Sequence, residues 1–157
     1  MIYYNISPQC VDPNGQPLYL TAQQSTLTVA VATLLPNNDS SQLWTPVEYI
    51  SGNDQGFVLL NLQTNMVISA PDNDAAVILT ALNAMNRGTW RFIGQDYGAL
   101  QLQANTDMNL NVAGNGPYPT GTAVLAWDWS GGDPNEVWNF QMVVLQPGKA
   151  GMYSCLP

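Results

Sequence analysis

The pentapeptide PNEVW, residues 134–138, matches two earlier segments of the chain, SSQLW at 40–44 and NRGTW at 86–90. Each segment ends in a tryptophan. The first and second of these tryptophans are 46 residues apart (44 to 90), and the second and third are 48 apart (90 to 138). Internal periods of this length are typical of an architecture built from one recurring unit. The sequence therefore predicts a threefold repeat.

Each repeat holds four short segments that are rich in β-branched and aromatic residues and are bounded by turn-forming residues. In chain order they are IYYNIS, PLYLTA, TLTVAVATLL and LWTPVEYI; GFVLLNLQ, MVISA, AAVILTAL and TWRFIG; GALQLQA, MNLNVAG, TAVLAWDW and VWNFQMVV. Helix signals are nearly absent, because no stretch sustains apolar residues at i, i+3 and i+4 with a cap. A β-propeller is the competing repeat architecture, but three blades fall short of the usual four or more.

We therefore predict an all-β chain of twelve strands in three pseudo-symmetric four-strand repeats. An even number of short strands favours closure of the sheet, which removes its edges. The chain is expected to form a single domain over 1–157, with repeats at roughly 1–53, 54–96 and 97–146 and a C-terminal tail at 147–157.

Charge is scarce in this sequence and mostly negative. Only 9% of the 157 residues are charged, against roughly 25% in typical globular chains. Three basic residues, Arg87, Arg91 and Lys149, oppose eleven carboxylates, for a formal net charge of -8. Nucleic acid is not an expected partner, because neutralising phosphates requires a basic footprint. A polar but scarcely charged surface suits recognition by neutral hydrogen bonds instead.

No apolar run approaches the roughly 20 residues that span a bilayer, so membrane insertion is not expected. The N-terminal segment MIYYNISPQC lacks the basic and apolar regions of a signal peptide, which predicts a cytoplasmic or non-classically secreted protein. Cys10 and Cys155 stand near opposite ends of the chain. They could form a disulfide if the termini meet, or stay as two reduced thiols, and the sequence leaves both readings open.

Enzyme chemistry has little support in the residues. The chain contains no histidine, which excludes Ser-His-Asp and Cys-His nucleophilic sites and every His-ligated metal centre. No pattern pairs Glu48 or Glu136 with a second carboxylate for glycoside hydrolysis. The short acidic turn at 72–74 lacks the rest of an EF-hand loop. We predict a protein that is not an enzyme and that needs no metal or cofactor.

Gln42-Leu43-Trp44, the repeat length and the segment MNLNVAGNGPYPTGTAVLAWDWSGGDPNEVW resemble the ricin-B-type (R-type) lectins and their QxW repeats. The resemblance covers essentially the whole chain and is most detailed in the third repeat. It implies a β-trefoil fold and non-covalent binding of glycans or glycoproteins, in the setting of a defence lectin.

A site for a neutral sugar needs an exposed aromatic plane and a few fixed donors and acceptors. The resemblance implies that Asn111 on the second strand of the third repeat, Trp127 near the end of its third strand and Asn135 before its fourth meet at the surface. Each asparagine offers a donor and an acceptor, enough to chelate vicinal hydroxyls. Neighbouring side chains are expected to extend or cover the site, which then comprises Asn111, Tyr118, Trp127, Asp128, Trp129 and Asn135.

The third repeat departs from the R-type pattern at three positions. Asn111 replaces the acidic residue, Leu125 replaces a polar residue two before the aromatic, and Glu136 replaces the glutamine of Asn-Gln-x-Trp. Loss of the acid removes a charge-assisted acceptor, so galactose specificity does not follow from the resemblance.

The first two repeats match the pattern less well. Thr21 and Ser69 stand where the third repeat has Asn111, and an aliphatic residue and Thr80 stand where it has Trp127. The sequence therefore predicts one working pocket per chain, in the third repeat. Because a single shallow sugar site binds weakly, we also expect a homodimer or another arrangement that presents several pockets.

The five tryptophans divide into two groups. Trp44, Trp90 and Trp138 occupy equivalent positions in the repeats and are predicted to share one continuous core. Trp127 and Trp129 have no aromatic counterparts in the other repeats, so symmetry does not account for them, and they are candidates for ligand binding.

A rival function belongs to a different class. β-Trefoils also include protease inhibitors, whose exposed loops enter a protease cleft. Asn86-Arg87-Gly88 could present Arg87 to a trypsin-like pocket in this way. An inhibitor has no evident need for the cluster of Trp127 and Trp129, which favours the lectin reading.

Overall fold

A computed structural model of the chain describes residues 2–51, 54–93 and 98–145. Within these ranges the regular structure is β-strand apart from two short 3-10 helices, which agrees with the prediction of an all-β chain. The predicted tail at 147–157 lies outside the described residues. The elements are β1 (Tyr3–Pro8), β2 (Leu18–Gln23), β3 (Thr28–Thr33), η1 (Ser40–Gln42), β4 (Trp44–Ser51), β5 (Asp54–Asn61), β6 (Val67–Ser69), β7 (Ala75–Ala76), β8 (Ile78–Thr80), η2 (Leu82–Ala84), β9 (Trp90–Ile93), β10 (Ala99–Leu102), β11 (Met108–Val112), β12 (Val124–Asp128) and β13 (Trp138–Val143).

The described residues form thirteen strand segments, not the predicted twelve. The segment AAVILTAL, predicted as one strand, is split at Val77 into β7 and β8. The Val77 N–H donates to Val124 O at 2.9 Å, whereas the Leu79 N–H donates to Leu27 O at 2.8 Å. The segment thus passes from one neighbouring strand to another within three residues, which divides it into two short pieces.

Six strands pair in a ring. β1 pairs with β13 and β4, β4 with β5, β5 with β9, and β9 with β10. An isolated bridge between Ala99 and Val137 and a hydrogen bond of 3.1 Å from the Trp138 N–H to Gly98 O link β10 back to β13. These six are the first and fourth strands of each repeat.

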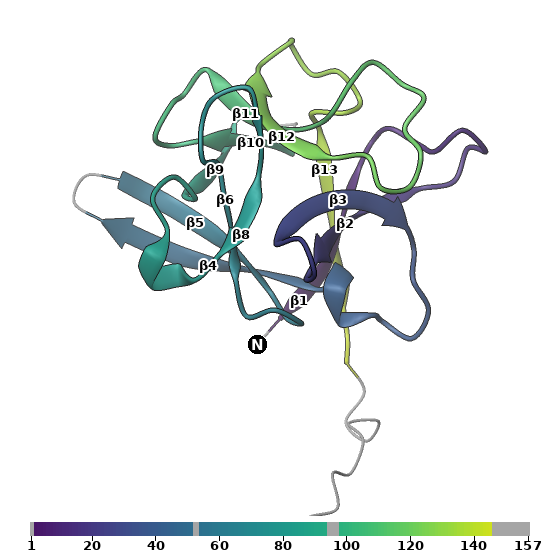
Figure 1. The fold of residues 1–157 in the computed structure, drawn as a ribbon, viewed down its shortest axis with the longest axis horizontal. Coiled ribbons are helices and arrows are strands. Elements are labelled where there is room, and N and C mark those ends of the chain that lie inside the picture. The colour runs from purple at the N-terminus through teal and green to yellow at the C-terminus, as the bar shows by residue number, and fades with distance from the viewer. Residues whose placement is uncertain (1, 52–53, 94–97, 146–157) are drawn as a thin grey trace, which may run out of the picture.

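The other strands form one hairpin per repeat: β2 with β3, β6 with β8, and β11 with β12. The three hairpins also contact one another, because β3 pairs with β8, β7 pairs with β12, and Ala30 forms a bridge with Ala123. The β11–β12 hairpin lies at the top of the view in Figure 1. A ring of six strands carrying three hairpins in threefold arrangement is the predicted β-trefoil.

One buried tryptophan per repeat anchors the core. Trp44, Trp90 and Trp138 are 0%, 0% and 1% exposed, which confirms that they are core residues. Each indole Nε1–H donates to a main-chain oxygen on the second strand of its own repeat. These bonds run from Trp44 to Leu20 O at 2.9 Å, from Trp90 to Ile68 O at 3.5 Å and from Trp138 to Leu110 O at 2.8 Å. The indole thus fixes the fourth strand against the hairpin, next to the position that Asn111 occupies in the third repeat.

Two glycines permit close approach of the main chain at this junction. A Cβ atom on Gly56 would overlap Trp90 O, and one on Gly98 would overlap Trp138 O. Both glycines occupy the position where the first strand of a repeat passes the core tryptophan, so any side chain there would push the two strands apart.

No helix in the described ranges is long and apolar enough to cross a membrane.

Candidate functional site

A surface hollow of about 290 Å³ lies beside the β11–β12 hairpin, in the third repeat. It is the space between the hairpin, the loop that follows β11 and the loop that leads into β13. Its lining residues are Asn111, Gly114, Asn115, Leu125, Trp127, Ser130, Asp133 and Asn135.

Strand alternation aims the hairpin side chains into this hollow. Met108, Leu110 and Val112 of β11 belong to the core cluster, so Asn111 between them points to the opposite face. Asn111 pairs across the hairpin with Leu125, and Trp127 lies two residues further along β12 on the same face. Trp127 is 43% exposed and forms an aromatic wall of the hollow.

Asn135 closes the base of the hollow with a set of side-chain hydrogen bonds. Its Nδ2 donates to Asn111 Oδ1 at 2.7 Å, to Val112 O at 3.0 Å and to Gly114 O at 3.2 Å. Its own main-chain oxygen accepts from the Val112 N–H at 2.9 Å. Asn111 and Asn135 are therefore held rigidly together, but the amide nitrogen of Asn135 is already engaged. The expectation that Asn135 offers a ligand both a donor and an acceptor is wrong, because internal oxygens occupy its donor.

Glu136 lies behind the two asparagines and is 0% exposed. Its Oε1 accepts from the Ser130 N–H at 2.8 Å and from Asn111 Nδ2 at 3.1 Å, and its Oε2 accepts from the Gly132 N–H at 3.2 Å. This carboxylate joins the loop after β12 to the second strand of the repeat. Its effect is to fix the wall and the base of the hollow relative to each other.

The first repeat has a neutral counterpart of this arrangement. Gln42, at the position of Glu136, donates from Nε2 to Thr21 Oγ1 at 3.1 Å and to Thr33 O at 3.0 Å. Its Oε1 accepts from the Leu35 N–H at 2.8 Å. Both repeats therefore tie the same three segments together. Gln42 does so as donor and acceptor, whereas Glu136 does so as acceptor alone.

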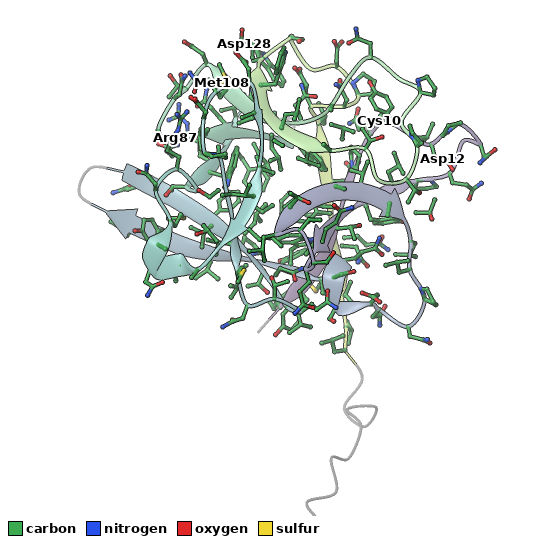
Figure 2. All side chains as sticks on the ribbon, viewed as in Figure 1. Cys10, Asp12, Arg87, Met108 and Asp128 are labelled. Carbon is green, nitrogen blue, oxygen red and sulfur yellow. The ribbon has the colours of Figure 1, made fainter. Side chains whose placement is uncertain are left out.

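Three of the six predicted site residues, Asn111, Trp127 and Asn135, line this hollow together. Asp128 and Trp129 line a different, more open hollow of about 440 Å³, shared with Ile93, Gln101, Thr106 and Asp107. Asp128 pairs across the hairpin with Met108, and both are labelled at the upper edge of Figure 2. Alternation along β12 sends Asp128 to the face opposite Trp127. Trp129 lies beyond the end of β12, so the alternation does not extend to it.

Tyr118 does not line the hollow. Its ring packs against the core, and its hydroxyl donates to Gly114 O at 3.2 Å. Burial, with the nearby groups of Cys10 and Asp133, raises the pKa of Tyr118. Tyr118 therefore supports the loop that carries Gly114 rather than covering a ligand.

Sequence reasoning missed Asp133, Ser130 and Asn115 as lining residues. The available signal was the loop SGGDPN at 130–135, in which Gly131 and Gly132 have φ of 100° and 103°. Two successive residues in this conformation require glycine and fold the loop back on itself. The fold of the loop brings Ser130 and Asp133 to the same hollow.

The hairpins of the first two repeats lack an aromatic wall. Their register places Thr21 opposite Ala30, and Ser69 opposite Ile78, where the third repeat pairs Asn111 with Leu125. Two residues further along, at the position of Trp127, they have Ala32 and Thr80. One working pocket per chain stays a prediction, and these residues agree with it.

The side chain of Arg87 is folded against the neighbouring turn. It donates from Nη2 to Asn73 Oδ1, and its Nη1 lies 3.9 Å from Asp72 Oδ1. The side chain is 22% exposed, and the residue is labelled in Figure 2. An inhibitory arginine must project freely into a protease, so this geometry argues against the inhibitor reading.

Cys10 is buried, and burial raises the pKa of its thiol to about 11. Cys155 lies outside the described residues, so the predicted choice between a disulfide and two thiols stays open.

No protein-family model and no curated protein sequence matches the chain. Solved structures do. An endo-β-galactosidase from Clostridium perfringens that releases GlcNAcα1-4Gal superposes with a TM-score of 0.73 at 12% identity, over 92% of this chain and 33% of that one. The chain thus spans about a third of that enzyme's length.

Two further structures match the chain over nearly their whole length. The C-half of an earthworm R-type lectin in complex with GalNAc superposes with a TM-score of 0.66 at 14% identity, over 91% of this chain and 100% of the lectin chain. The designed threefold-symmetric protein ThreeFoil superposes with a TM-score of 0.64 at 18% identity, over 88% of this chain and 97% of that chain. The fold is the β-trefoil, and structures that share it include R-type lectin domains.

Proposed function

We propose that the chain is a carbohydrate-binding protein that holds glycans non-covalently in the hollow of the third repeat. The observation that carries the proposal is the exposed indole of Trp127 standing beside two asparagines fixed by a hydrogen-bond network. An indole face suits the apolar C–H face of a sugar ring, and fixed amides suit its hydroxyl rim.

Rigidity of the polar groups adds to this argument. Asn135 is bonded to main-chain oxygens of Val112 and Gly114, and Glu136 to main-chain N–H groups of Ser130 and Gly132. Side chains held in this way lose little conformational entropy when a ligand arrives. A shallow site can therefore gain useful affinity from few contacts.

The structural comparisons support the same class of ligand. The earthworm lectin domain that superposes on nearly the whole chain was solved with GalNAc, and the Clostridium enzyme acts on a galactoside. Identities of 12% and 14% carry no residue-level transfer, so the sugar bound here is a separate question.

We infer binding without catalysis. Glycoside hydrolysis needs two carboxyl groups that reach the glycosidic bond. Glu136, the carboxylate that accepts from Asn111, is fully buried and accepts hydrogen bonds from three internal donors. It can hold the site together but cannot contact a substrate, and Asp133 is the one carboxylate among the lining residues.

The partners we propose are glycans or glycoproteins, and neither nucleic acid nor inserted membrane. A single shallow hollow gives weak binding, so useful strength requires several hollows presented together. A homodimer would supply this, and light scattering at high protein concentration measures it.

A glycan-array screen of the parent chain beside Trp127→Ala tests the function. Phe92→Ala is the matched control, because Phe92 is also an exposed aromatic but packs on Phe57 and Phe140 of the strand ring. We expect binding by the parent and by the control and its loss in Trp127→Ala, with circular dichroism unchanged. Absence of glycan binding by the parent chain would contradict the proposal.

A further inference from the structure

At Asn135, the donor and the acceptor of each hydrogen bond in the hollow can be assigned. Val112 O and Gly114 O are main-chain carbonyls, which can only accept, and both lie within 3.2 Å of the same side-chain atom of Asn135. That atom must be the amide nitrogen. Asn135 is therefore left with Oδ1, an acceptor, as the atom it can offer to a ligand.

Donors and acceptors can be assigned equally well at Glu136. The N–H groups of Ser130 and Gly132 can only donate, and they point to the two different oxygens of Glu136. The carboxylate also accepts from Asn111 Nδ2, which leaves Asn111 Oδ1 to accept from Asn135. If the Asn111 amide rotated by 180°, it would lose both of these hydrogen bonds. Donor and acceptor are therefore defined for every hydrogen bond that links Glu136, Asn111 and Asn135.

Fixed charge in the hollow has one sign. Asp133 is exposed at its mouth, and Glu136 stands behind its base. Neither lysine nor arginine is among the eight lining residues, and the chain as a whole carries a formal net charge of -8. The first repeat has neutral Gln42 where Glu136 stands, so the negative charge behind the base distinguishes the third repeat from the first.

An aromatic face beside acceptors and a carboxylate favours a cation over an anion, because the π-face of an indole and a carboxylate both attract positive charge. From this geometry we infer that the hollow binds amino sugars with a free, protonated amine in preference to neutral hexoses, and disfavours sugars that carry a carboxylate. The inference rests on the proposed function and names its ligand class. The sugar ring lies on Trp127, while the ammonium donates to the Asp133 carboxylate and to Asn135 Oδ1.

Two matched series of sugars test the inference by NMR titration of the parent chain. Each series differs in charge: glucosamine, glucose and glucuronic acid, and galactosamine, galactose and galacturonic acid. At low salt and at a pH below the pKa of the amine, we expect the amino sugar of the bound series to bind about threefold to fivefold more tightly than the hexose, as an exposed ion pair allows. The uronic acid should bind most weakly. The preference should decrease with added salt and as pH rises through the pKa of the amine.

Two variants with the same change in net charge locate the effect. Asp133→Asn should bring the ratio of amino-sugar to hexose affinity close to one. Glu48→Gln, at an exposed position of β4 in the strand ring opposite Phe57, should keep the parent ratio.

The outcomes separate this inference from the proposed function. Equal binding of hexose and amino sugar by the parent chain, or a preference that survives in Asp133→Asn, overturns the inference and leaves the lectin function in place. Failure of every sugar in both series to bind, together with an empty glycan array, overturns the proposed function itself.

Discussion

Asn111 Nδ2 donates to Glu136 Oε1 at 3.1 Å, so two of the positions at which the third repeat departs from the R-type pattern contact each other directly. The pattern has an acid at the first position and a glutamine at the second, whereas this chain has an amide and an acid. An acid and an amide have thus changed places between the two positions, and in this chain the amide of Asn111 donates to the acid of Glu136. The two departures are one coupled change.

Glu136→Gln tests this coupling. The main-chain N–H groups of Ser130 and Gly132 both face oxygens of Glu136, so the new amide nitrogen of the glutamine must face a donor. We expect the free energy of unfolding to fall by about 1–3 kcal/mol, the usual cost of an unsatisfied buried polar group. Urea denaturation measures it.

The double variant Asn111→Asp/Glu136→Gln is the matched control. The glutamine can then donate to the aspartate, while Asn135 Nδ2 still donates to residue 111. We expect part of the lost stability to return, though not all, because the Ser130 N–H points to the same atom of residue 136 as the side chain of residue 111, and that atom is then an amide nitrogen. A double variant no more stable than Glu136→Gln would show that the two positions are not coupled.

Gly98→Ala should destabilise the fold more than its single methyl group suggests. A Cβ atom there overlaps Trp138 O, and relief requires separation of β10 from β13. We expect a loss of at least about 2 kcal/mol, in the upper range for overpacking.

Gly131→Ala separates this overlap from simple backbone strain. Gly131 has a φ of 100°, but no atom lies within 4 Å of the place that an added methyl group would take, so its substitution costs strain alone. That strain amounts to about 1–2 kcal/mol. Comparable melting temperatures for Gly98→Ala and the parent chain would contradict the close approach of the two strands.

Cys10 should make stability depend on pH in the alkaline range. Burial raises its pKa from 9.0 to about 11. The unfolded chain therefore loses the thiol proton first, and stability from this group is complete below pH 9.0 and declines as pH rises to about 11. Urea denaturation at a series of pH values measures the decline, and Cys10→Ala should reduce it. The raised pKa of Tyr118 acts in the same direction, so part of the decline should persist in that variant.

Thiol reactivity gives a second measure of the same group. In a Cys155→Ser background, which leaves Cys10 as the one cysteine, native protein at neutral pH should react slowly with a thiol reagent and rapidly once unfolded. Equal rates in the native and unfolded states would contradict the burial of Cys10.

Repetition in the sequence was sufficient to predict much of this fold. Three tryptophans at a near-constant period predicted the core residues, because equivalent positions in a threefold structure share one environment. The period also predicted the four strand regions of each repeat. It could not predict the break at Val77, because that break depends on which strands of the other repeats lie alongside.

The site was less accessible to sequence reasoning. Trp127 could be identified as a candidate because the other two repeats have no aromatic residue at the equivalent position. The inclusion of Asp133 depended on the backbone conformation of Gly131 and Gly132, and the role of Glu136 depended on hydrogen bonds to residues 25 and 6 positions away. Asp128 and Trp129 were assigned by adjacency to Trp127, but alternation along β12 turns Asp128 to the opposite face, and Trp129 lies beyond the end of the strand.

The pairing of β1 with β13 brings together the first and last strands of the described chain, from Tyr3 opposite Val143 to Pro8 opposite Trp138. During synthesis on a ribosome, β1 must therefore wait for the chain to emerge as far as Val143 before its main partner exists. Local hairpins can form earlier, but the ring is completed last, as expected for a topology dominated by distant contacts. Trp138, which anchors the second strand of the third repeat, arrives in that same final segment. The proposed glycan-binding hollow and the ring thus both depend on residues that emerge late.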